Sequence, residues 1–149
     1  MKKYVVIGNP IEHSLSPKLH NFWIKSNSIK AIYSKEKVLK DNLKHIVDKL
    51  RNKKLYGINV TVPHKTEIIP YVDELTNEAQ HTQSVNTIFE RSGKIIGHNT
   101  DIAGFDLSLR HAKLNLKNKK VLILGAGGVS PSLVYALKSH ETQEVAISN

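Results

Sequence analysis

The sequence predicts an α/β protein with a three-layer α/β/α first domain and a mostly parallel sheet. Segments with strand patterning alternate with segments of helical spacing almost throughout the 149 residues. A polar stretch at 113–118 divides the chain into an expected first domain over 1–112 and a shorter unit over 113–149. The shorter unit reads strand, glycine-rich loop, helix, strand, which is how a Rossmann-like dinucleotide-binding domain begins.

The first strand is predicted at Lys3–Gly8, where an apolar run ends in Gly-Asn-Pro. A helix follows, with Ser16 as its N-cap and Pro17 at its first position. The apolar face of that helix is expected to consist of Leu19, Phe22 and Trp23. Residues 31–38 then read as a weak strand and residues 39–51 as an amphipathic helix.

The next strand begins at Gly57 and alternates apolar with polar residues, so Asn59 and Thr61 share one face. Pro63 stops the ladder because it has no N–H to donate, and Lys65 follows just past the strand end. An amide, a hydroxyl and an ammonium thus converge where open α/β sheets bind ligands. The alternative interpretation is an edge strand with a solvated polar face.

Two short helices are expected next, one directly after Pro63 and one over 75–82. Strands at 84–90 and 94–98 are joined by the short turn Arg91-Ser92-Gly93, which predicts a hairpin. The second hairpin strand ends in three polar residues that cap a helix over about 102–112, and in the shorter unit strands at 119–124 and 144–148 flank another helix.

The loop Gly125-Ala126-Gly127-Gly128-Val129 follows a strand and opens a helix, as the dinucleotide fingerprint requires. Its glycines allow a tight turn and let backbone N–H groups reach a pyrophosphate at the helix N-terminus. Ser130 occupies the third glycine position, which is a departure. The next strand ends in Ser148-Asn149 without the acidic residue of an NAD site, which favours a 2′-phosphate, provided that an Arg follows. Since such a domain needs about six strands, we expect this one to be the truncated start of a longer domain.

The composition is that of a globular protein, with 40% hydrophobic and 23% charged residues. The net charge of +9 suits nucleic acid, an anionic membrane surface or small acidic substrates. The lysines are scattered and lack interleaved aromatics, which argues against nucleic acid. No apolar run approaches the roughly 18 residues of a membrane span, and no signal-peptide core follows the N-terminus. We therefore expect a cytoplasmic protein that does not enter a membrane.

Several residue types can be assigned or excluded from spacing. The absence of cysteine excludes disulfides, thiolate zinc sites and thiol nucleophiles. The eight histidines show no metal-ligand spacing, so no metal is expected. Ser14 and Ser16 read either as a turn and helix cap or as a carboxylate site at a helix N-terminus. Taken alone, Asn86 reads as an exposed strand amide and Asp101 as a helix N-cap.

Together these motifs resemble those of the shikimate dehydrogenase family, in the family's order along the whole chain. The motifs are Gly8-Asn9-Pro10, His13-Ser14, Ser16-Pro17, Asn59-Val60-Thr61-Val62-Pro63-His64-Lys65, Val85-Asn86-Thr87, Asn99-Thr100-Asp101 and Gly125-Ala126-Gly127-Gly128. The resemblance implies reversible, NADPH-dependent reduction of 3-dehydroshikimate to shikimate, in the aromatic amino acid pathway. It implies a shikimate-binding first domain with a connecting helix, then the beginning of an NADP-binding domain.

The resemblance also assigns roles by motif. Lys65 is expected to be the catalytic acid/base, assisted by Asp101, and Ser14 with Ser16 to hold the substrate carboxylate. The residues expected at the ring hydroxyls are Asn59, Thr61, Asn86 and Asp101. The residues expected at the cofactor are Gly125, Ala126, Gly127, Gly128, Val129 and Asn149.

The chain departs from the family's pattern in length and in detail. Family members are longer by roughly a domain, so this chain alone is expected to be inactive. Gln83-Ser84 replaces the usual Gly-Ala, and Val129 and Pro131 replace smaller residues. The alternatives are a quinate/shikimate dehydrogenase using NAD or NADP, and a non-catalytic module that holds a shikimate-like acid. A homodimer is left open.

Overall fold

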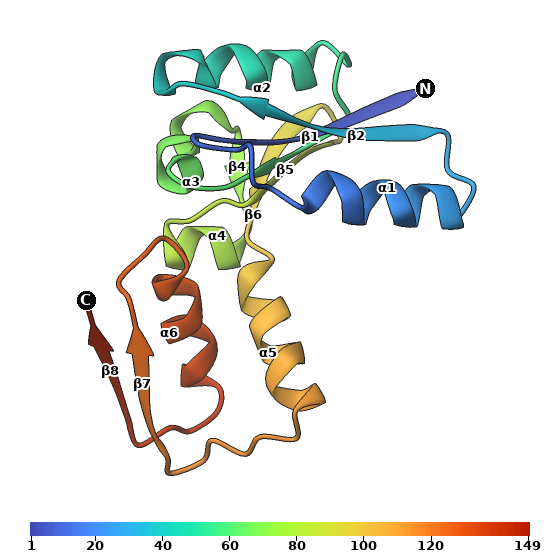
Figure 1. Cartoon of the computed structure of the whole chain (residues 1–149). Coiled ribbons are helices and arrows are strands. Elements are labelled where there is room, and N and C mark those ends of the chain that lie inside the picture. Colours follow the sequence, from blue (N-terminus) through green and yellow to red (C-terminus); the bar gives the residue numbers. More distant parts are fainter.

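The computed structural model describes residues 1–149 and contains two separate sheets (Figure 1). The larger sheet has the strand order β2-β1-β3-β5-β6-β4, and the smaller one pairs β7 with β8. The strands are β1 (Lys2–Gly8), β2 (Ala31–Lys37), β3 (Gly57–Val60), β4 (Glu74–Leu75), β5 (Thr87–Arg91), β6 (Lys94–His98), β7 (Lys120–Leu124) and β8 (Glu144–Ser148). The helices are α1 (Ser16–Ser26), α2 (Leu43–Arg51), α3 (His64–Glu67), α4 (Asn77–Thr82), α5 (Asp101–His111) and α6 (Ser130–Lys138), with 3₁₀ turns at Lys40–Asn42 and Ile69–Tyr71.

The larger sheet is mostly parallel, as predicted. β1 pairs in parallel with β2 and β3, and β4 pairs in parallel with β6. β5 alone runs antiparallel to its neighbours, β3 and β6. The predicted hairpin is therefore confirmed, and its turn residues Ser92 and Gly93 have φ values of 54° and 81°, which suit a tight two-residue turn.

Alternation of side chains along β1 supplies both faces of this sheet. Val5 and Ile7 lie in the larger core, whereas Val6 lies on the opposite face with Tyr33 and Ile11. The larger core is closed by four buried residues of α2: Leu43, Ile46, Val47 and Leu50. Each contributes roughly 1.5–3 kcal/mol by its burial. Helices α1 and α2 lie on opposite sides of the sheet (Figure 1), which gives the predicted three layers.

Helix α1 does not bury its predicted apolar face. Leu19, Phe22 and Trp23 are 47%, 65% and 48% exposed, and no residue of α1 is buried. The helix is held by other contacts: the ring of His20 stacks on Tyr33 at a centroid distance of 4.1 Å. Asn21 also exchanges two hydrogen bonds with the backbone of Tyr33, at 2.7 and 2.9 Å. Polar and aromatic anchoring to β2, with the half-buried Ile24 packed against the smaller core cluster, thus replaces the predicted apolar face.

Other predicted boundaries shift where local pairing decides the outcome. The helix predicted over 75–82 begins only at Asn77, because Glu74 and Leu75 pair with β6 as strand β4. Thr76 caps this helix by accepting a hydrogen bond from Ala79 N–H. The strand predicted over 84–90 begins at Thr87.

The second unit consists of β7, α6 and β8, and its two strands are parallel. Helices α5 and α6 pack side by side beneath the larger sheet (Figure 1). His140, in the turn just after α6, contacts Asp106 of α5 over 2.8 Å between Nε2 and Oδ1. None of the helices combines the length and apolar character that a membrane crossing demands.

Candidate active site at the carboxyl edge of the sheet

The topology brings distant polar residues to one edge of the larger sheet. Strands β1, β3 and β6 are parallel in direction and end at this edge, and the antiparallel β5 begins there. The loops after β1 and β3 are joined by hydrogen bonds from Thr61 N–H to Ile7 (2.9 Å) and from Asn9 N–H to Val62 (3.0 Å). This is the edge at which α/β sheets bind ligands.

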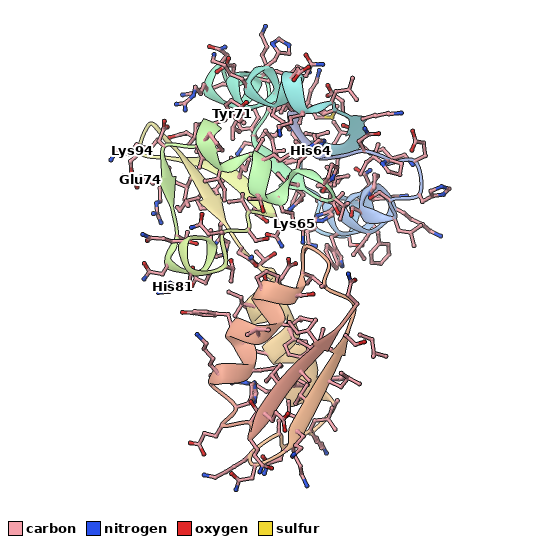
Figure 2. The ribbon with its side chains drawn as sticks, turned by 90° about the vertical axis from the view of Figure 1, so that its left-hand side faces the viewer. His64, Lys65, Tyr71, Glu74, His81 and Lys94 are labelled. Carbon is pink, nitrogen blue, oxygen red and sulfur yellow. The ribbon has the colours of Figure 1, made fainter.

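Lys65, Asp101 and Asn86 form the centre of this edge. Lys65 Nζ lies 2.6 Å from Asp101 Oδ2, and Asn86 Nδ2 donates to Asp101 Oδ1 over 2.8 Å. The Lys65 and Asp101 side chains are 14% and 22% exposed, so the pair is accessible yet largely desolvated. Figure 2 shows Lys65 on the side of the larger part that faces the second unit.

Asp101 is not the N-cap of α5, contrary to the interpretation of that residue alone. Thr100 occupies the N-cap position without a side-chain cap, and Asp101 is the first helical residue. The Asp101 carboxylate is consequently free of capping and is used by Lys65 and Asn86.

Asn86 is likewise not a free strand amide. Its Oδ1 accepts from Thr100 N–H (3.0 Å) and is also approached by the hydroxyls of Thr100 (3.1 Å) and Thr87 (3.0 Å). These contacts fix the amide plane, so the orientation of Asn86 toward Asp101 is set before any ligand arrives.

Asn59 is engaged on both ends of its amide. Tyr33 donates its hydroxyl to Asn59 Oδ1 over 2.6 Å, and Asn59 Nδ2 donates to Asn86 O (3.2 Å) and Thr87 Oγ1 (3.1 Å). Burial raises the pKa of Tyr33, which keeps the phenol protonated as a donor. Both N–H groups of Asn59 are thus used within the protein, and they support Asn86.

A hollow of about 280 Å³ lies beside the start of α1. It is lined by Ser14, Ser16 and Thr61, and also by His13. Ser14 Oγ accepts from Ser16 N–H over 3.3 Å. The predicted N-cap role of Ser16 is wrong, because Leu15 occupies the N-cap position in a helical conformation. The Ser16 hydroxyl makes no hydrogen bond within the chain, so it is available to a ligand at the N-terminus of α1.

The residue before Lys65 is a support that the sequence pattern did not reveal. His64 is buried, its Nε2 lies 2.7 Å from Val38 O, and its Nδ1 lies 2.9 Å from Glu67 Oε2. The hydrogen bond with His64, followed by that with Lys40, lowers the pKa of Glu67. Val85 N–H donates to Lys65 O over 2.8 Å, so α3 is fixed on both sides.

The glycine loop of the second unit presents backbone donors that the chain itself does not use. Gly125 has φ +103°, a conformation that favours glycine. The backbone N–H groups of Ala126, Gly127, Gly128 and Val129 donate to no group in the chain. Four exposed donors in front of a helix fit a pyrophosphate.

The hydroxyl of Ser130 accounts for a serine at the position where the fingerprint has a third glycine. It donates to Gly125 O over 2.9 Å and so closes the loop on itself. Gly125 N–H in turn donates to Ser148 O over 2.6 Å, which brings the loop beside the end of β8, where Asn149 follows. No group of three or more histidine, aspartate or glutamate side chains in the structure could hold a metal ion.

The structure thus assembles two groups of the predicted residues at one sheet edge and the loop residues in the second unit. Four further residues support these groups without having been assigned a separate role from the sequence: Tyr33, His64, Thr87 and Asn99. His64, Thr87 and Asn99 belonged to recognised motifs, and that was the available signal.

Comparisons with known proteins agree with this arrangement. A family profile described as the shikimate dehydrogenase substrate binding domain matches residues 6–88. The chain is 53% identical to a Pelagibacter ubique protein named shikimate dehydrogenase (NADP(+)), over 99% of this chain and 56% of that protein. The chain spans about half the length of the curated relatives it matches.

Solved structures show the same fold. Shikimate dehydrogenase 1 from Peptoclostridium difficile superposes with a TM-score of 0.93 at 28% identity, over 100% of this chain and 57% of that one. Shikimate 5-dehydrogenase from Thermus thermophilus, solved in complex with NADP(H) and shikimate, gives a TM-score of 0.90 at 30% identity, with the same coverage. The predicted fold class is confirmed.

Proposed function

Because the chain belongs to the shikimate dehydrogenase family, we propose that it forms the substrate-binding part of an enzyme that reversibly reduces 3-dehydroshikimate to shikimate with NADPH. The observation that carries this proposal is the 2.6 Å contact between Lys65 and Asp101 at the carboxyl edge of the sheet. The curated relatives carry the name shikimate dehydrogenase (NADP(+)), and the Thermus thermophilus structure contains shikimate.

The residues at this edge suit a small polyol carboxylate. Ser14 and Ser16 at the start of α1 offer hydroxyls to the substrate carboxylate. Thr61, which lines the same hollow, offers its hydroxyl to the substrate ring. Asn86 and Asp101 offer an amide and a carboxylate to ring hydroxyls. We assign Asn59 to the support of Asn86, since both of its N–H groups are already used.

Lys65 provides the proton that the reduction needs. NADPH, when bound, supplies the hydride, and the carbonyl oxygen of the substrate then takes up a proton from the Lys65 ammonium. In the reverse direction, the neutral amine takes that proton from the C3 hydroxyl. Asp101 accepts a hydrogen bond from Nζ and so holds the lysine side chain in one orientation.

The glycine loop supports the choice of NADP as cofactor. The free N–H groups of residues 126–129 would hold the pyrophosphate, and Asn149 lies at the strand end where the 2′-phosphate is recognised. We place the substrate domain at 1–112 and the beginning of the cofactor domain at 113–149, in keeping with the division into two sheets.

We place this function in the cytoplasm, because the proposed reaction consumes NADPH, a diffusible hydride donor of biosynthesis. A homodimer through the exposed face of α1 is the oligomeric state that its three large apolar side chains support. Light scattering on the wild type and on Phe22→Ser tests it: a dimeric mass that the variant loses supports a dimer, and a monomeric wild type contradicts it.

Calorimetric titration of the 149-residue chain with shikimate tests the proposed function. We expect saturable binding that Lys65→Met weakens and that Lys94→Met, an exposed lysine paired with Glu74, leaves unchanged. Methyl shikimate, which lacks the carboxylate charge, should bind more weakly than shikimate to the wild type. Ser16→Ala should reduce that difference. Absence of shikimate binding, or equal binding by Lys65→Met, would contradict the proposal.

A further inference from the structure

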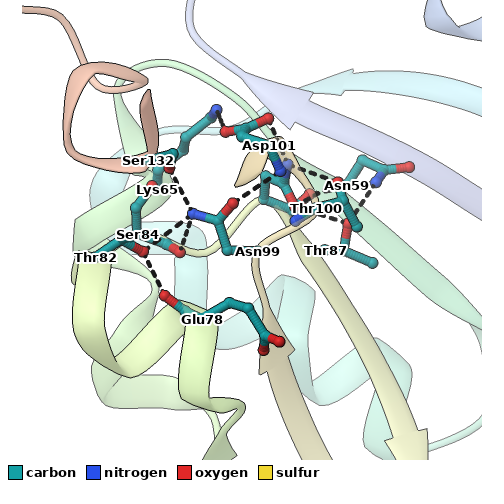
Figure 3. A network of polar contacts seen from close by, with 11 residues as sticks. Asn59, Lys65, Glu78, Thr82, Ser84, Thr87, Asn99, Thr100, Asp101 and Ser132 are labelled. Atoms are coloured by element: carbon teal, nitrogen blue, oxygen red, sulfur yellow. Dashed lines mark hydrogen bonds and ion pairs between the residues drawn. The ribbon is translucent and has the colours of Figure 1, made fainter. Parts of the chain in front are cut away.

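The side chain of Asn99 joins the two parts of the molecule. It follows β6, is 1% exposed, and lies between the larger sheet and helix α6 (Figure 3). Its Nδ2 lies 2.9 Å from Ser132 Oγ, 3.0 Å from Ser84 O and 3.1 Å from Thr82 Oγ1. Its Oδ1 accepts from Asp101 N–H over 2.8 Å. One amide therefore contacts α4, the turn before β5, the start of α5, and α6.

Ser132 is the partner on the far side of this joint. It lies in the first turn of α6, directly after the glycine loop, and its side chain is completely buried. Its hydroxyl makes no other hydrogen bond in the structure. At Asn99, one hydrogen bond to Ser132 thus links α6 to the larger sheet.

The joint has more acceptors than the amide can satisfy. A carboxamide carries two N–H hydrogens, and Asn99 Nδ2 faces three acceptors. The hydroxyl of Ser84, which occupies the place of a usual alanine, is buried beside it without any partner. The two N–H hydrogens of Asn99 can therefore change partners among Thr82, Ser84 and Ser132, and each of them still has an acceptor.

The other end of the same amide reaches the reacting groups. A carboxamide is planar, so a rotation that follows Ser132 also moves Oδ1 relative to Asp101 N–H. Asp101 in turn carries the hydrogen bonds of Lys65 and Asn86. A displacement of the glycine-loop helix is thereby transmitted to the Lys65–Asp101 pair through three consecutive contacts.

We propose that Asn99 is a positioning residue that couples the seating of α6 on the larger sheet to the geometry of Asp101 and Lys65. This rests on the proposed function for its consequence: occupation of the glycine loop by a dinucleotide and of the sheet edge by a shikimate-like acid then favour each other. The coupling depends on the Ser132 hydroxyl, which links α6 to Asn99.

The test compares two serines: Ser132 in the first turn of α6 and Ser139 at the C-cap of the same helix. Ser132→Ala removes the bond to Asn99, whereas Ser139→Ala removes a hydroxyl bond that stays within α6, to Ala136 O. In the unliganded chain, NMR should show a shifted Asp101 amide resonance and at least about threefold faster amide exchange in Ser132→Ala only. An Asp101 amide that responds equally to both variants, or to neither, would overturn the proposal.

Shikimate titration provides the functional readout. Ser132→Ala should raise the Kd for shikimate about three- to tenfold, although Ser132 lies outside the substrate-binding residues, and Ser139→Ala should leave it unchanged. Ser132→Thr, which retains the hydroxyl, should restore the Asp101 amide. An unchanged Kd in Ser132→Ala counts against the coupling. A wild type that binds no shikimate refutes the proposed function, while the Asp101 amide still decides whether the joint exists.

Discussion

Lys65 Nζ donates to Asp101 Oδ2 over 2.6 Å, although the two residues are 36 positions apart in the chain. The contact exists because β3 and β6 run in the same direction with only β5 between them, so that α3 and α5 both begin at one edge. The sheet therefore fixes the proposed acid/base and the carboxylate that orients it, independently of any ligand.

Replacement of Lys65 should abolish most of the turnover. Activity is measured in a chimera in which this chain replaces the matching part of the Pelagibacter ubique relative. In this chimera, Lys65→Met should lower kcat by about 10²–10⁴-fold, because a positioned acid/base contributes that much, with a small change in KM. A kcat within threefold of the parent chimera would remove Lys65 from the mechanism.

Loss of the Asp101 charge should weaken substrate binding. Asp101→Asn leaves the shape but replaces a charge-assisted contact with Lys65, so the Kd for shikimate should rise about tenfold or more. Asp106→Asn is the matched control in the same helix, since Asp106 pairs with Arg110 and His140 away from the edge. Calorimetric titration of the 149-residue chain with shikimate compares the Kd values of the two variants. Equal effects of both variants would contradict the role of Asp101 in substrate binding.

Gly8 is required by close packing at the carboxyl edge of the sheet. A Cβ there would lie 2.7 Å from Thr61 Cγ2 and 3.0 Å from Val62 O, so Gly8→Ala must displace Thr61. We expect lower stability and weaker shikimate binding. Gly104→Ala in α5 meets nothing within 4 Å and should instead stabilise the chain, by up to about 1 kcal/mol. Urea unfolding measures both variants, and a neutral Gly8→Ala would disprove the packing argument.

The phenol of Tyr33 should stabilise the site through Asn59. Tyr33→Phe leaves Asn59 Oδ1 without its 2.6 Å donor, which should cost about 1 kcal/mol of unfolding free energy. Tyr56→Phe serves as the control, because Tyr56 is exposed and its hydroxyl forms no hydrogen bond. Chemical denaturation should show a lower midpoint for Tyr33→Phe alone; indistinguishable midpoints would argue that the bond contributes nothing.

Acid should weaken the fold through Asp73. Hydrogen bonds from Arg51, and next from Ile95 N–H, lower the pKa of Asp73 from 3.8 to about 2. A depressed folded-state pKa means that the stabilisation is complete above pH 3.8 and is lost as pH falls toward 2. The Tm difference between wild type and Asp73→Asn should therefore shrink over this interval.

Asp41→Asn, at an exposed carboxylate outside any ion pair, is the control for that experiment. Its Tm difference from the wild type should stay nearly constant between pH 4 and pH 2, the interval set by the pKa of Asp73. A constant difference for Asp73→Asn as well would contradict the role of the Arg51 contact.

The sequence was informative where a residue's location follows from local pattern. Lys65 and Asp101 each follow a strand, and carboxyl ends of parallel strands share an edge, so their convergence could be anticipated. The hairpin followed from its turn residues. The glycine loop was identified because its strand-loop-helix context is local.

The remaining features depend on register and packing that no local pattern contains. Tyr33 reaches Asn59 only because β2 and β3 flank β1 at a particular offset. The exposed face of α1 was mispredicted because helical spacing does not say that polar contacts to Tyr33 will anchor the helix. Ser16 was misassigned as a cap because the helical conformation of Leu15 is invisible in the sequence.

The small sheet has a consequence for how the protein behaves in the test tube. Along β7, Ile123 is buried and Val121 half-buried, whereas Leu122 and Leu124 are exposed. Each strand of this pair also has one edge that no other strand covers. Uncovered backbone next to exposed leucines is a template for self-adhesion. We therefore expect concentrated solutions of the 149-residue chain to aggregate through the β7–β8 sheet. Leu124→Lys should slow this aggregation without changing the sheet edge at Lys65.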